Sequence, residues 1–313
     1  MRSTNARILN RITRSLRELQ SHRPLSPSTL ARLRDELAVE MTYHSNAIEG
    51  NRLTLKETLL VLREGITIKG KNLKEHLEAK NHQEAMDFLF DLVDTKDRIP
   101  VTHHLIRTLH QLIVRESEAD LAGRYRDTDV QILGSRHRPP PGYRVEEQMG
   151  LFLIWLRSHK NHYHPVEFAA IAHHRFVSIH PFEDGNGRTG RLLMNLILMK
   201  AGYPIAIIQK NDRKKYYQAL QSADSDDPEA FVRVTAQAVE RVLNLYLRVS
   251  EKSTPETRLV LLSELTAETG ISAKYLNLLA RKGLLKAQKE GRNWYSSLAN
   301  VGEYKRSRLR KRS

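Results

Sequence analysis

Cysteine is absent from this chain of 313 residues, and the absence limits what the protein can be. The chain has no disulfide framework and no thiolate chemistry, which suits a reducing compartment, so we expect a cytoplasmic protein. No apolar run is long enough to span a bilayer, and the N-terminus lacks the apolar core of a signal peptide, so we expect no membrane association. Hydrophobic residues make up 40% of the chain, enough for a sizeable core in two or three domains.

Acidic residues are too few to balance the basic ones, and the imbalance lies at the two ends. The net charge is +15. Residues 1–34 carry eight Arg and one acidic residue, a net +7, and residues 251–313 carry fourteen Lys or Arg and six acidic residues, a net +8, so the middle is neutral. Such ends could contact nucleic acid or an acidic partner, or could simply be solvated basic surfaces.

One polar stretch stands between two apolar helical segments. It reads His-Pro-Phe-Glu-Asp-Gly-Asn-Gly-Arg-Thr-Gly-Arg and covers residues 180–191. The segment before it, 167–179, and the segment after it, 192–199, both have the composition of core helices. A glycine-rich polar turn held between two such helices is a typical design of a functional site, because a rigid scaffold positions its reactive groups.

The glycines and arginines of this turn predict an anion site. Gly185 and Gly187 allow unusual backbone conformations and close approach of a ligand. The next helix should begin near Arg188, so its unpaired N–H groups and the positive end of its dipole would bind an anion, best a phosphate. Arg191 lies three residues further on, on the same helical face, and would clamp further phosphate oxygens together with Arg188.

The same turn carries groups for metal binding and proton transfer. Asp184 offers the hard oxygen ligand that Mg²⁺ prefers, Asn186 can donate to a phosphate oxygen, and His180 can take a proton near neutral pH. Together these groups predict phosphoryl or nucleotidyl transfer. For a single histidine, a capped helix–turn–helix with a buried His would be the simpler interpretation, but it explains the full set of residues poorly.

The stretch resembles the signature of the Fic (Fic/Doc) family, His-Pro-Phe-x-(Asp/Glu)-Gly-Asn-Gly-Arg-x-x-Arg, at every fixed position. The resemblance implies an enzyme that transfers AMP from Mg²⁺-bound ATP to a Ser, Thr or Tyr hydroxyl of a target protein, which could include the chain itself. It assigns His180 as the base, Asp184 as the Mg²⁺ ligand, and Gly185, Asn186, Gly187, Arg188 and Arg191 as phosphate-binding residues. Doc-like kinases of the superfamily differ at the second glycine, so Gly187 favours AMP transfer over phosphate transfer.

A second motif ends a helix that we predict from Pro27 to about Ile48. Ser45 and Glu49 are four residues apart and share a helical face. The helix dipole opposes a glutamate at a C-terminus, so Glu49 calls for a tertiary explanation. The segment matches the family's inhibitory motif, (Ser/Thr)-x-x-x-Glu-(Gly/Asn), and the resemblance implies that Glu49 pairs with Arg191 and blocks the terminal phosphate of ATP. The alternative is a surface glutamate at a helix end.

Residues 122–143 are the one stretch without helical periodicity. Val130, Ile132 and Leu133 have β character, a Gly-Ser turn follows, and three prolines come after it, so we predict a short β-hairpin at about Val130–His137. In the Fic family such a hairpin, the flap, covers the site and positions the target segment by strand addition. An ordinary edge hairpin is the alternative.

Two further regions receive roles. The resemblance places the helix expected at 213–221 beside the nucleotide, where Tyr216 or Tyr217 would contact adenine or ribose. Residues 253–255 suggest a linker, followed by short helices at 258–265, 266–271 and 272–281 and a wing hairpin around Glu290-Gly291. This module resembles a winged helix-turn-helix, whose third helix would enter a DNA major groove, and a basic tail follows it. Such a module could equally dock a protein or serve dimerisation, and we expect a homodimer.

The predicted fold is therefore mainly α-helical, with a Fic core, a small hairpin flap and a C-terminal winged helix-turn-helix module. Three parts are expected: residues 1–95 with the inhibitory helix at about 27–50, the catalytic core at 96–250, and the winged-helix module at 251–313. Two other functions compete with AMP transfer. The same site could remove AMP, with Glu49 positioning a water, or the chain could be a DNA-binding regulator whose Fic core only senses nucleotide. The signature does not secure ATP over another nucleotide, since base selection depends on pocket shape.

Overall fold

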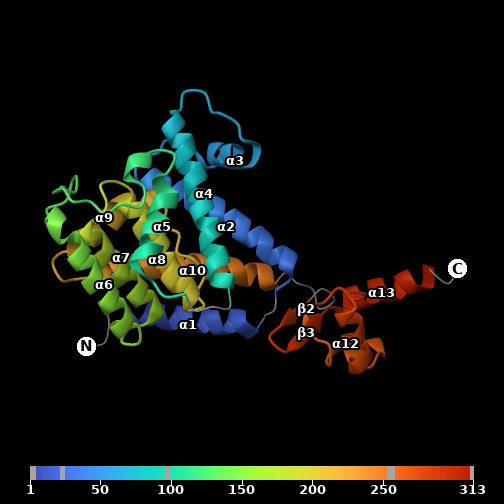
Figure 1. Ribbon diagram of the computed structural model, residues 1–313. Coiled ribbons are helices and arrows are strands. Elements are labelled where there is room, and N and C mark those ends of the chain that lie inside the picture. Colours follow the sequence, from blue (N-terminus) through green and yellow to red (C-terminus); the bar gives the residue numbers. More distant parts are fainter. Residues whose placement is uncertain (1–4, 22–24, 96–98, 252–257, 311–313) are drawn as a thin grey trace. The chain divides into compact units, whose positions relative to one another are not determined.

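The computed structural model describes residues 5–21, 25–95, 99–251 and 258–310, and these are mainly helical (Figure 1). They belong to two compact units, one formed from residues 1–12 and 36–242 and the other from residues 13–35 and 243–313. The end of the predicted inhibitory helix and residues 96–242 of the predicted catalytic core thus share the first unit. The linker predicted at 253–255 lies outside the described residues. None of the described helices is both long enough and apolar enough to cross a membrane.

The helices follow one another along the chain, with a long connection between α5 and α6. They are α1 (Ala6–Ser21), α2 (Pro27–Ile48), α3 (Leu55–Glu64), α4 (Leu73–Asp94), α5 (His103–Val114), α6 (Val145–His159), α7 (Pro165–Ile179), α8 (Asn186–Lys200), α9 (Arg213–Ala223), α10 (Glu229–Glu251), α11 (Leu265–Thr269), α12 (Ala273–Arg281) and α13 (Leu298–Arg310). Single 3-10 turns are η1 (Ala119–Leu121), η2 (Gly142–Arg144) and η3 (Lys210–Asp212).

Local capping explains where several of these helices begin. Thr54 and Glu57 form a capping box at α3: the Thr54 hydroxyl accepts from Glu57 N at 3.2 Å, and the Glu57 carboxylate accepts from Thr54 N at 2.7 Å. At α5 the Thr102 hydroxyl accepts from Leu105 N at 3.2 Å. Such caps satisfy N–H groups that the helix itself leaves unpaired, so side chains next to each start fix where these helices begin.

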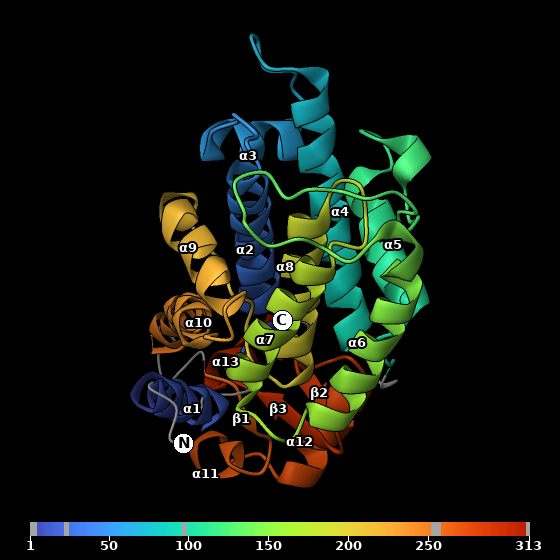
Figure 2. The same ribbon diagram turned by 90° about the vertical axis from the view of Figure 1, so that its left-hand side faces the viewer.

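Helices α7 and α8 form the centre of the first unit. They pack against each other, α5 and α4 pack on α8, and α6 packs on α7 (Figures 1 and 2). Gly190 allows the close approach of α7 and α8, since a Cβ there would lie 2.9 Å from His173 Nδ1. Phe176 near the end of α7 and Phe182 within the turn between the two helices are fully buried. The polar turn is therefore fixed by well-packed helices before and after it.

The hairpin predicted at Val130–His137 is wrong. All of residues 122–143 are described and none belongs to a strand; residues 130–137 are irregular, with a turn in which Ser135 N donates to Ile132 O at 3.1 Å (Figure 2, green). Its polar groups bond outward instead of across a ladder: His137 Nε2 donates to Ser178 O at 2.8 Å, and Gly134 O accepts from Gln221 Nε2 at 3.1 Å. The prolines that follow have no N–H for a ladder. We call residues 124–141 the flap loop.

The second unit contains a small antiparallel sheet of β1 (Val260–Leu261), β2 (Gln288–Glu290) and β3 (Asn293–Ser296), in the order β1-β3-β2. The helix predicted at 258–265 is wrong, because Val260 pairs with Ser296 of β3 and forms a strand. The hairpin predicted around residues 290–291 is confirmed by the pairing of β2 with β3. Helix α12 begins after Ser272, whose hydroxyl accepts from Tyr275 N. The identification as a winged helix stays a prediction.

Candidate active site

His180 ends α7 in a left-handed backbone conformation, with φ of 50°. A residue other than glycine is strained there by roughly 1 kcal/mol or more, so neighbouring contacts must hold it. Its Nδ1 lies 3.2 Å from Val177 O, and because a carbonyl only accepts, Nδ1 carries the proton and Nε2 keeps the lone pair. Burial lowers the pKa of His180 below the ordinary 6.5. The imidazole is thus neutral near pH 7, as a general base requires.

Helix α8 begins at Asn186, two residues earlier than predicted. Gly185 precedes it with φ of 77°, and the helical bonds start with Thr189 N donating to Gly185 O at 2.9 Å. The backbone N–H groups of Asn186, Gly187 and Arg188 come before that bond and have no helical acceptor. Together with the positive end of the α8 dipole, they form an anion site in the turn.

The Asn186 side chain closes the turn. Its Oδ1 accepts from Phe182 N at 2.9 Å, and its Nδ2 donates to Phe182 O at 2.7 Å. Only 2% of Asn186 is exposed. Its phosphate contact stays a prediction and would have to use the backbone N–H or the second amide hydrogen.

Arg191 lies buried in α8 and reaches the end of α2. Its Nη2 lies 2.8 Å from Glu49 Oε1, its Nε donates to Ser45 Oγ at 3.0 Å, and its Nη2 also donates to Ser45 O at 2.8 Å. Burial alone would lower the pKa of Arg191, but the attraction of Glu49 raises it. The contact implied between Ser45, Glu49 and Arg191 is therefore present.

Gly187 and two tyrosines surround this ion pair. A Cβ at Gly187 would lie 2.1 Å from Glu49 Oε1, so only glycine fits while Glu49 holds Arg191. The Tyr217 hydroxyl donates to Glu49 Oε2 at 3.5 Å. The Tyr216 hydroxyl accepts from Arg191 Nη1 at 3.4 Å and is 2.8 Å from His173 Nε2. The nucleotide contacts of Tyr216 and Tyr217 stay predictions.

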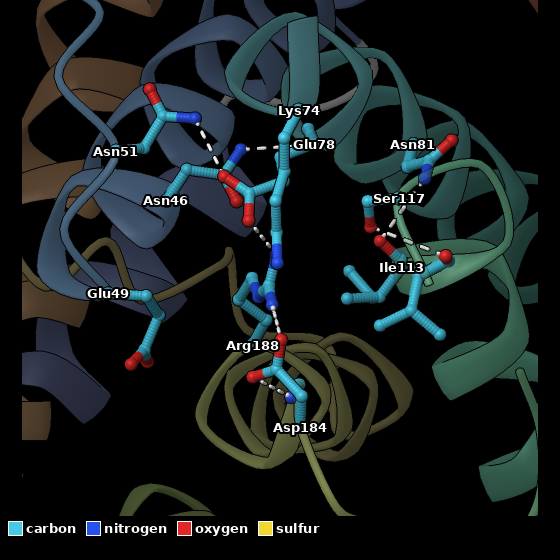
Figure 3. Close-up of polar contacts among 12 residues, drawn as sticks. Asn46, Glu49, Asn51, Lys74, Glu78, Asn81, Ile113, Ser117, Asp184 and Arg188 are labelled. Carbon is cyan, nitrogen blue, oxygen red and sulfur yellow. Dashed lines mark hydrogen bonds and ion pairs between the residues drawn. The ribbon is translucent and has the colours of Figure 1, made fainter. Parts of the chain in front are cut away.

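Arg188 is held between two carboxylates (Figure 3). Its Nη1 lies 3.2 Å from Glu78 Oε1 on α4, and its Nη2 donates to Asp184 Oδ2 at 3.2 Å. Glu78 Oε2 accepts from Asn51 Nδ2 at 2.9 Å, so the chain just after the inhibitory motif is also tied to this pair. With only 2% of its surface exposed, Arg188 acts in this state as a support of Asp184.

Asp184 is a half-exposed carboxylate of the turn, with 49% of its side chain accessible. Burial would raise the pKa of Asp184, but Arg188 above all lowers it, so the group is ionised. Among the described residues, no three His, Asp or Glu side chains are grouped so that they could hold a metal by themselves. Mg²⁺ is commonly bound by one or two carboxylates together with phosphate and water oxygens, so Asp184 fits an ion that arrives with a nucleotide.

Three site residues escaped the sequence reasoning. His110 stacks on Phe182 at 3.7 Å between ring centres, and its Nε2 donates to Asp184 O at 2.9 Å. Arg126 donates to His180 O at 2.7 Å. Nothing local marks either residue. Glu78 had a signal, because the buried face of α4 is unusually polar: Glu75, His76, Asn81 and His82 are buried there.

The residues predicted to dock a target lie in the flap loop. Val130 and Ile132 are partly buried, whereas Leu133 is fully exposed at the turn of the loop. Their docking role stays a prediction. Because the loop contains no strand, a target segment would have to pair with backbone of the loop that is extended but has no strand partner.

Comparison with known sequences points to one family. Residues 100–198 match the model of the Fic/DOC family. The chain is 40% identical over 225 residues to the protein adenylyltransferase Fic of Nematostella vectensis, covering 72% of this chain and 52% of that protein. It is 41% identical over 229 residues to the protein of the same name from Aedes aegypti, covering 72% and 45%. The chain thus spans about half the length of these relatives.

Solved structures agree with this. Fic-1 from C. elegans superposes with a TM-score of 0.73 at 33% identity, covering 80% of this chain and 74% of that one. A Fic domain containing signaling protein from Bacteroides thetaiotaomicron gives a TM-score of 0.71 at 28% identity, covering 79% and 98%. The helical arrangement around the turn at residues 180–191 is therefore shared with these proteins.

Proposed function

This chain belongs to the Fic/DOC family, and from that membership we propose that it is a protein adenylyltransferase. In the proposed reaction a Ser, Thr or Tyr hydroxyl of a target protein attacks the α-phosphorus of ATP. A bond forms between that oxygen and phosphorus, the bond to the β-phosphate oxygen breaks, and pyrophosphate leaves. The observation that carries the proposal is the turn between α7 and α8, where a neutral base, an anion site and an ionised carboxylate meet.

Each group of the turn has one task in this reaction. His180 Nε2 takes the proton of the target hydroxyl, because Nδ1 is occupied by Val177 O. The first N–H groups of α8 hold phosphate oxygens, and Arg191 would hold the terminal phosphate once it is released from Glu49. Asp184, braced by Arg188, would hold Mg²⁺. When bound, that ion neutralises phosphate charge and favours departure of pyrophosphate.

Glu49 is proposed to keep the resting protein inactive. The buried Arg191 guanidinium is already engaged by Glu49, by Ser45 and by the Tyr216 hydroxyl, so a phosphate can use it only if Glu49 moves. Glu49 can move, because 31% of its side chain is exposed and it lies at the negative end of the α2 dipole. The Glu49–Arg191 ion pair therefore fits the proposed role of a contact that inhibits the protein and can be released.

The experiment that tests the function follows label from ATP carrying a radioactive α-phosphate. Wild type, Glu49→Gly and Glu49→Gly/His180→Ala are incubated with Mg²⁺, with and without cell lysate as a source of target. We expect weak labelling by wild type, strong labelling by Glu49→Gly, and a fall of about 10²–10⁴-fold when His180 is also replaced. Label on the chain itself without lysate would reveal self-modification.

A matched reaction with label on the γ-phosphate separates the proposed activity from a kinase. AMP transfer leaves the γ-phosphate in pyrophosphate, so no protein should be labelled. Protein labelling from γ-labelled ATP, or none from α-labelled ATP in any variant that binds ATP, would overturn the proposal.

Removal of AMP is a second candidate for the same site. One observation favours it: Glu49 is close enough to His180 to raise the pKa of that histidine, though less than burial lowers it. A carboxylate near the base could position a water for attack on an AMP–protein bond. Wild type should then release AMP from a pre-modified target, and Glu49→Gly should not.

The second unit is proposed to dock nucleic acid. Arg308 Nη1 donates to the Tyr275 hydroxyl at 2.9 Å and Lys305 Nζ donates to Thr269 O at 2.7 Å, so basic residues of α13 lie beside the end of α11 and the start of α12. Binding to duplex DNA should weaken steeply with salt and should survive His180→Ala. If no duplex binds, protein docking or self-association of this unit takes its place, and the mass of the protein in solution distinguishes a homodimer from a monomer.

A further inference from the structure

Arg126, in the flap loop, is almost fully buried, with 3% of its surface exposed. Its guanidinium donates to four main-chain carbonyl oxygens: Nε to His180 O at 2.7 Å, Nη2 to Ile179 O at 3.2 Å and to Pro140 O at 2.8 Å, and Nη1 to Thr128 O at 2.6 Å. Its own N–H donates to Pro181 O at 2.9 Å. One side chain therefore joins the turn that bears the base to both arms of the flap loop.

Two of these carbonyls belong to the C-terminal end of α7. The last carbonyls of a helix have no helical donor and carry the negative end of its dipole, so a cation there is favourable. His180 needs such support because its backbone adopts the strained left-handed conformation, with φ of 50°. Arg126 thus caps α7 at the residue that carries the base.

The other two carbonyls belong to opposite arms of the flap loop, which meet closely at its base. Gly142 N donates to Asp129 Oδ1 at 2.8 Å, and a Cβ at Gly142 would lie only 2.1 Å from Asp127 O. Arg126 lies at this closure. A shift of the loop that moved Thr128 or Pro140 would therefore pull on the guanidinium that holds His180.

We propose that Arg126 is a positioning residue for His180, and that it couples the flap loop to the alignment of the base. The proposal rests on AMP transfer as the function of the site. Arginine suits this role because its planar guanidinium presents five donors in a fixed geometry, whereas the lysine ammonium offers three around a single point. A lysine at position 126 could not reach all four carbonyls at once.

The role predicts a specific kinetic pattern in the Glu49→Gly background. Arg126→Gln should lower kcat for AMP transfer by about 10- to 100-fold, because small displacements of a catalytic group are costly. Arg126→Lys should retain only part of the activity. ATP binding, measured by calorimetry, should stay within about twofold in both, since Arg126 contacts no phosphate-binding group. Arg124→Gln, at an exposed position two residues away, is the matched control and should behave as its parent.

Two readouts would not respond to a merely structural role. Among the influences on His180, the Arg126 cation lowers its pKa, so Arg126→Gln should move the imidazole titration, followed by NMR, toward the ordinary histidine value. Ethylguanidinium added to Arg126→Ala should restore part of kcat by occupying the vacated site, with no effect on Arg124→Gln.

Thermal unfolding shows which variants are folded, and Arg126→Lys replaces any that is not. A folded Arg126→Gln with unchanged kcat and unchanged His180 titration would overturn the proposal, as would a loss of ATP binding that matches the loss of rate. If Glu49→Gly itself transfers no AMP, the proposed function fails. The NMR titration of His180 still decides whether Arg126 positions it.

Discussion

Two arginines near the start of α8 meet carboxylates in opposite ways. Arg188 and Arg191 are both buried, and each faces a glutamate from another helix. Glu78 lies within α4, has 13% of its side chain exposed and is held by Asn51 as well as by Arg188. Glu49 lies just beyond the end of α2, has 31% of its side chain exposed, and has only a long contact to Tyr217 besides Arg191.

This difference shows how one helix can carry both a fixed ion pair, that of Arg188, and an ion pair that is proposed to open, that of Arg191. The Arg188 pair is enclosed by a second carboxylate, that of Asp184, and keeps this group in place. The Arg191 pair fits the proposed release of one partner, since the helix dipole opposes Glu49 and solvent reaches it. If Glu49 inhibits the protein as proposed, its contact with Arg191 has to be weaker than the contacts that hold the fold together. The Glu49–Arg191 and Glu78–Arg188 ion pairs differ in this way.

The largest expected contrast is in stability. Glu78→Ala should lower the free energy of unfolding by about 2–3 kcal/mol, because it leaves the buried Arg188 with Asp184 alone. Glu49→Ala should cost less, about 1–2 kcal/mol: it leaves Arg191 without a carboxylate, but Arg191 keeps Ser45 and Tyr216, water can reach the vacated position because Glu49 is partly exposed, and the helix dipole is relieved of a carboxylate. Urea unfolding of the two variants beside wild type measures both. Equal losses would remove the distinction between support and switch.

Activity should show the reverse order. Glu49→Gly should raise the initial rate of AMP transfer by about 10- to 100-fold, the range of an ordinary coupling between two sites. Glu78→Gln, which keeps the shape of the side chain but removes its charge, should give no rise. If both variants activate equally, each glutamate acts as a brake and the comparison fails.

A smaller change tests the weakest contact of the switch. Tyr217→Phe removes the hydroxyl that donates to Glu49 over 3.5 Å. A bond of this length contributes little, so transfer should rise only about two- to threefold. The rate is compared with that of Glu49→Gly, and a rise as large as in that variant would show that Tyr217 is the main support of Glu49.

The finest test is the titration of His180. Burial lowers its pKa below 6.5, and the neutral form is the active base, so activity should persist below pH 6.5 and fall only as pH drops through the lowered pKa. Glu49 raises that pKa, so His180 should titrate at lower pH in Glu49→Gly than in wild type. NMR of the imidazole protons measures both, and a titration above 6.5 in wild type would contradict the burial of the base.

Predictions from sequence held where the cause was local. The turn at residues 180–191 contains its own base, glycines and carboxylate, and the hairpin around residues 290–291 joins two strands that are close in the chain. The predictions failed where a residue distant in the chain determines the local structure. The segment at 130–137 has β character but forms no strand pair, and it bonds to α7 and α9. Val260 was expected in a helix and pairs with Ser296.

The sequence by itself therefore determined the two helices around the turn, the reactive groups that the turn contains and, through the family motif, the meeting of Glu49 with Arg191. Only the tertiary structure decided that Glu78 holds Arg188 and that Arg126 holds His180. Each of these contacts joins elements far apart in the chain, and a buried charge takes whichever partner the packing of those elements brings to it. The periodicity of residues within one helix does not predict these contacts, because they form between different elements of the chain.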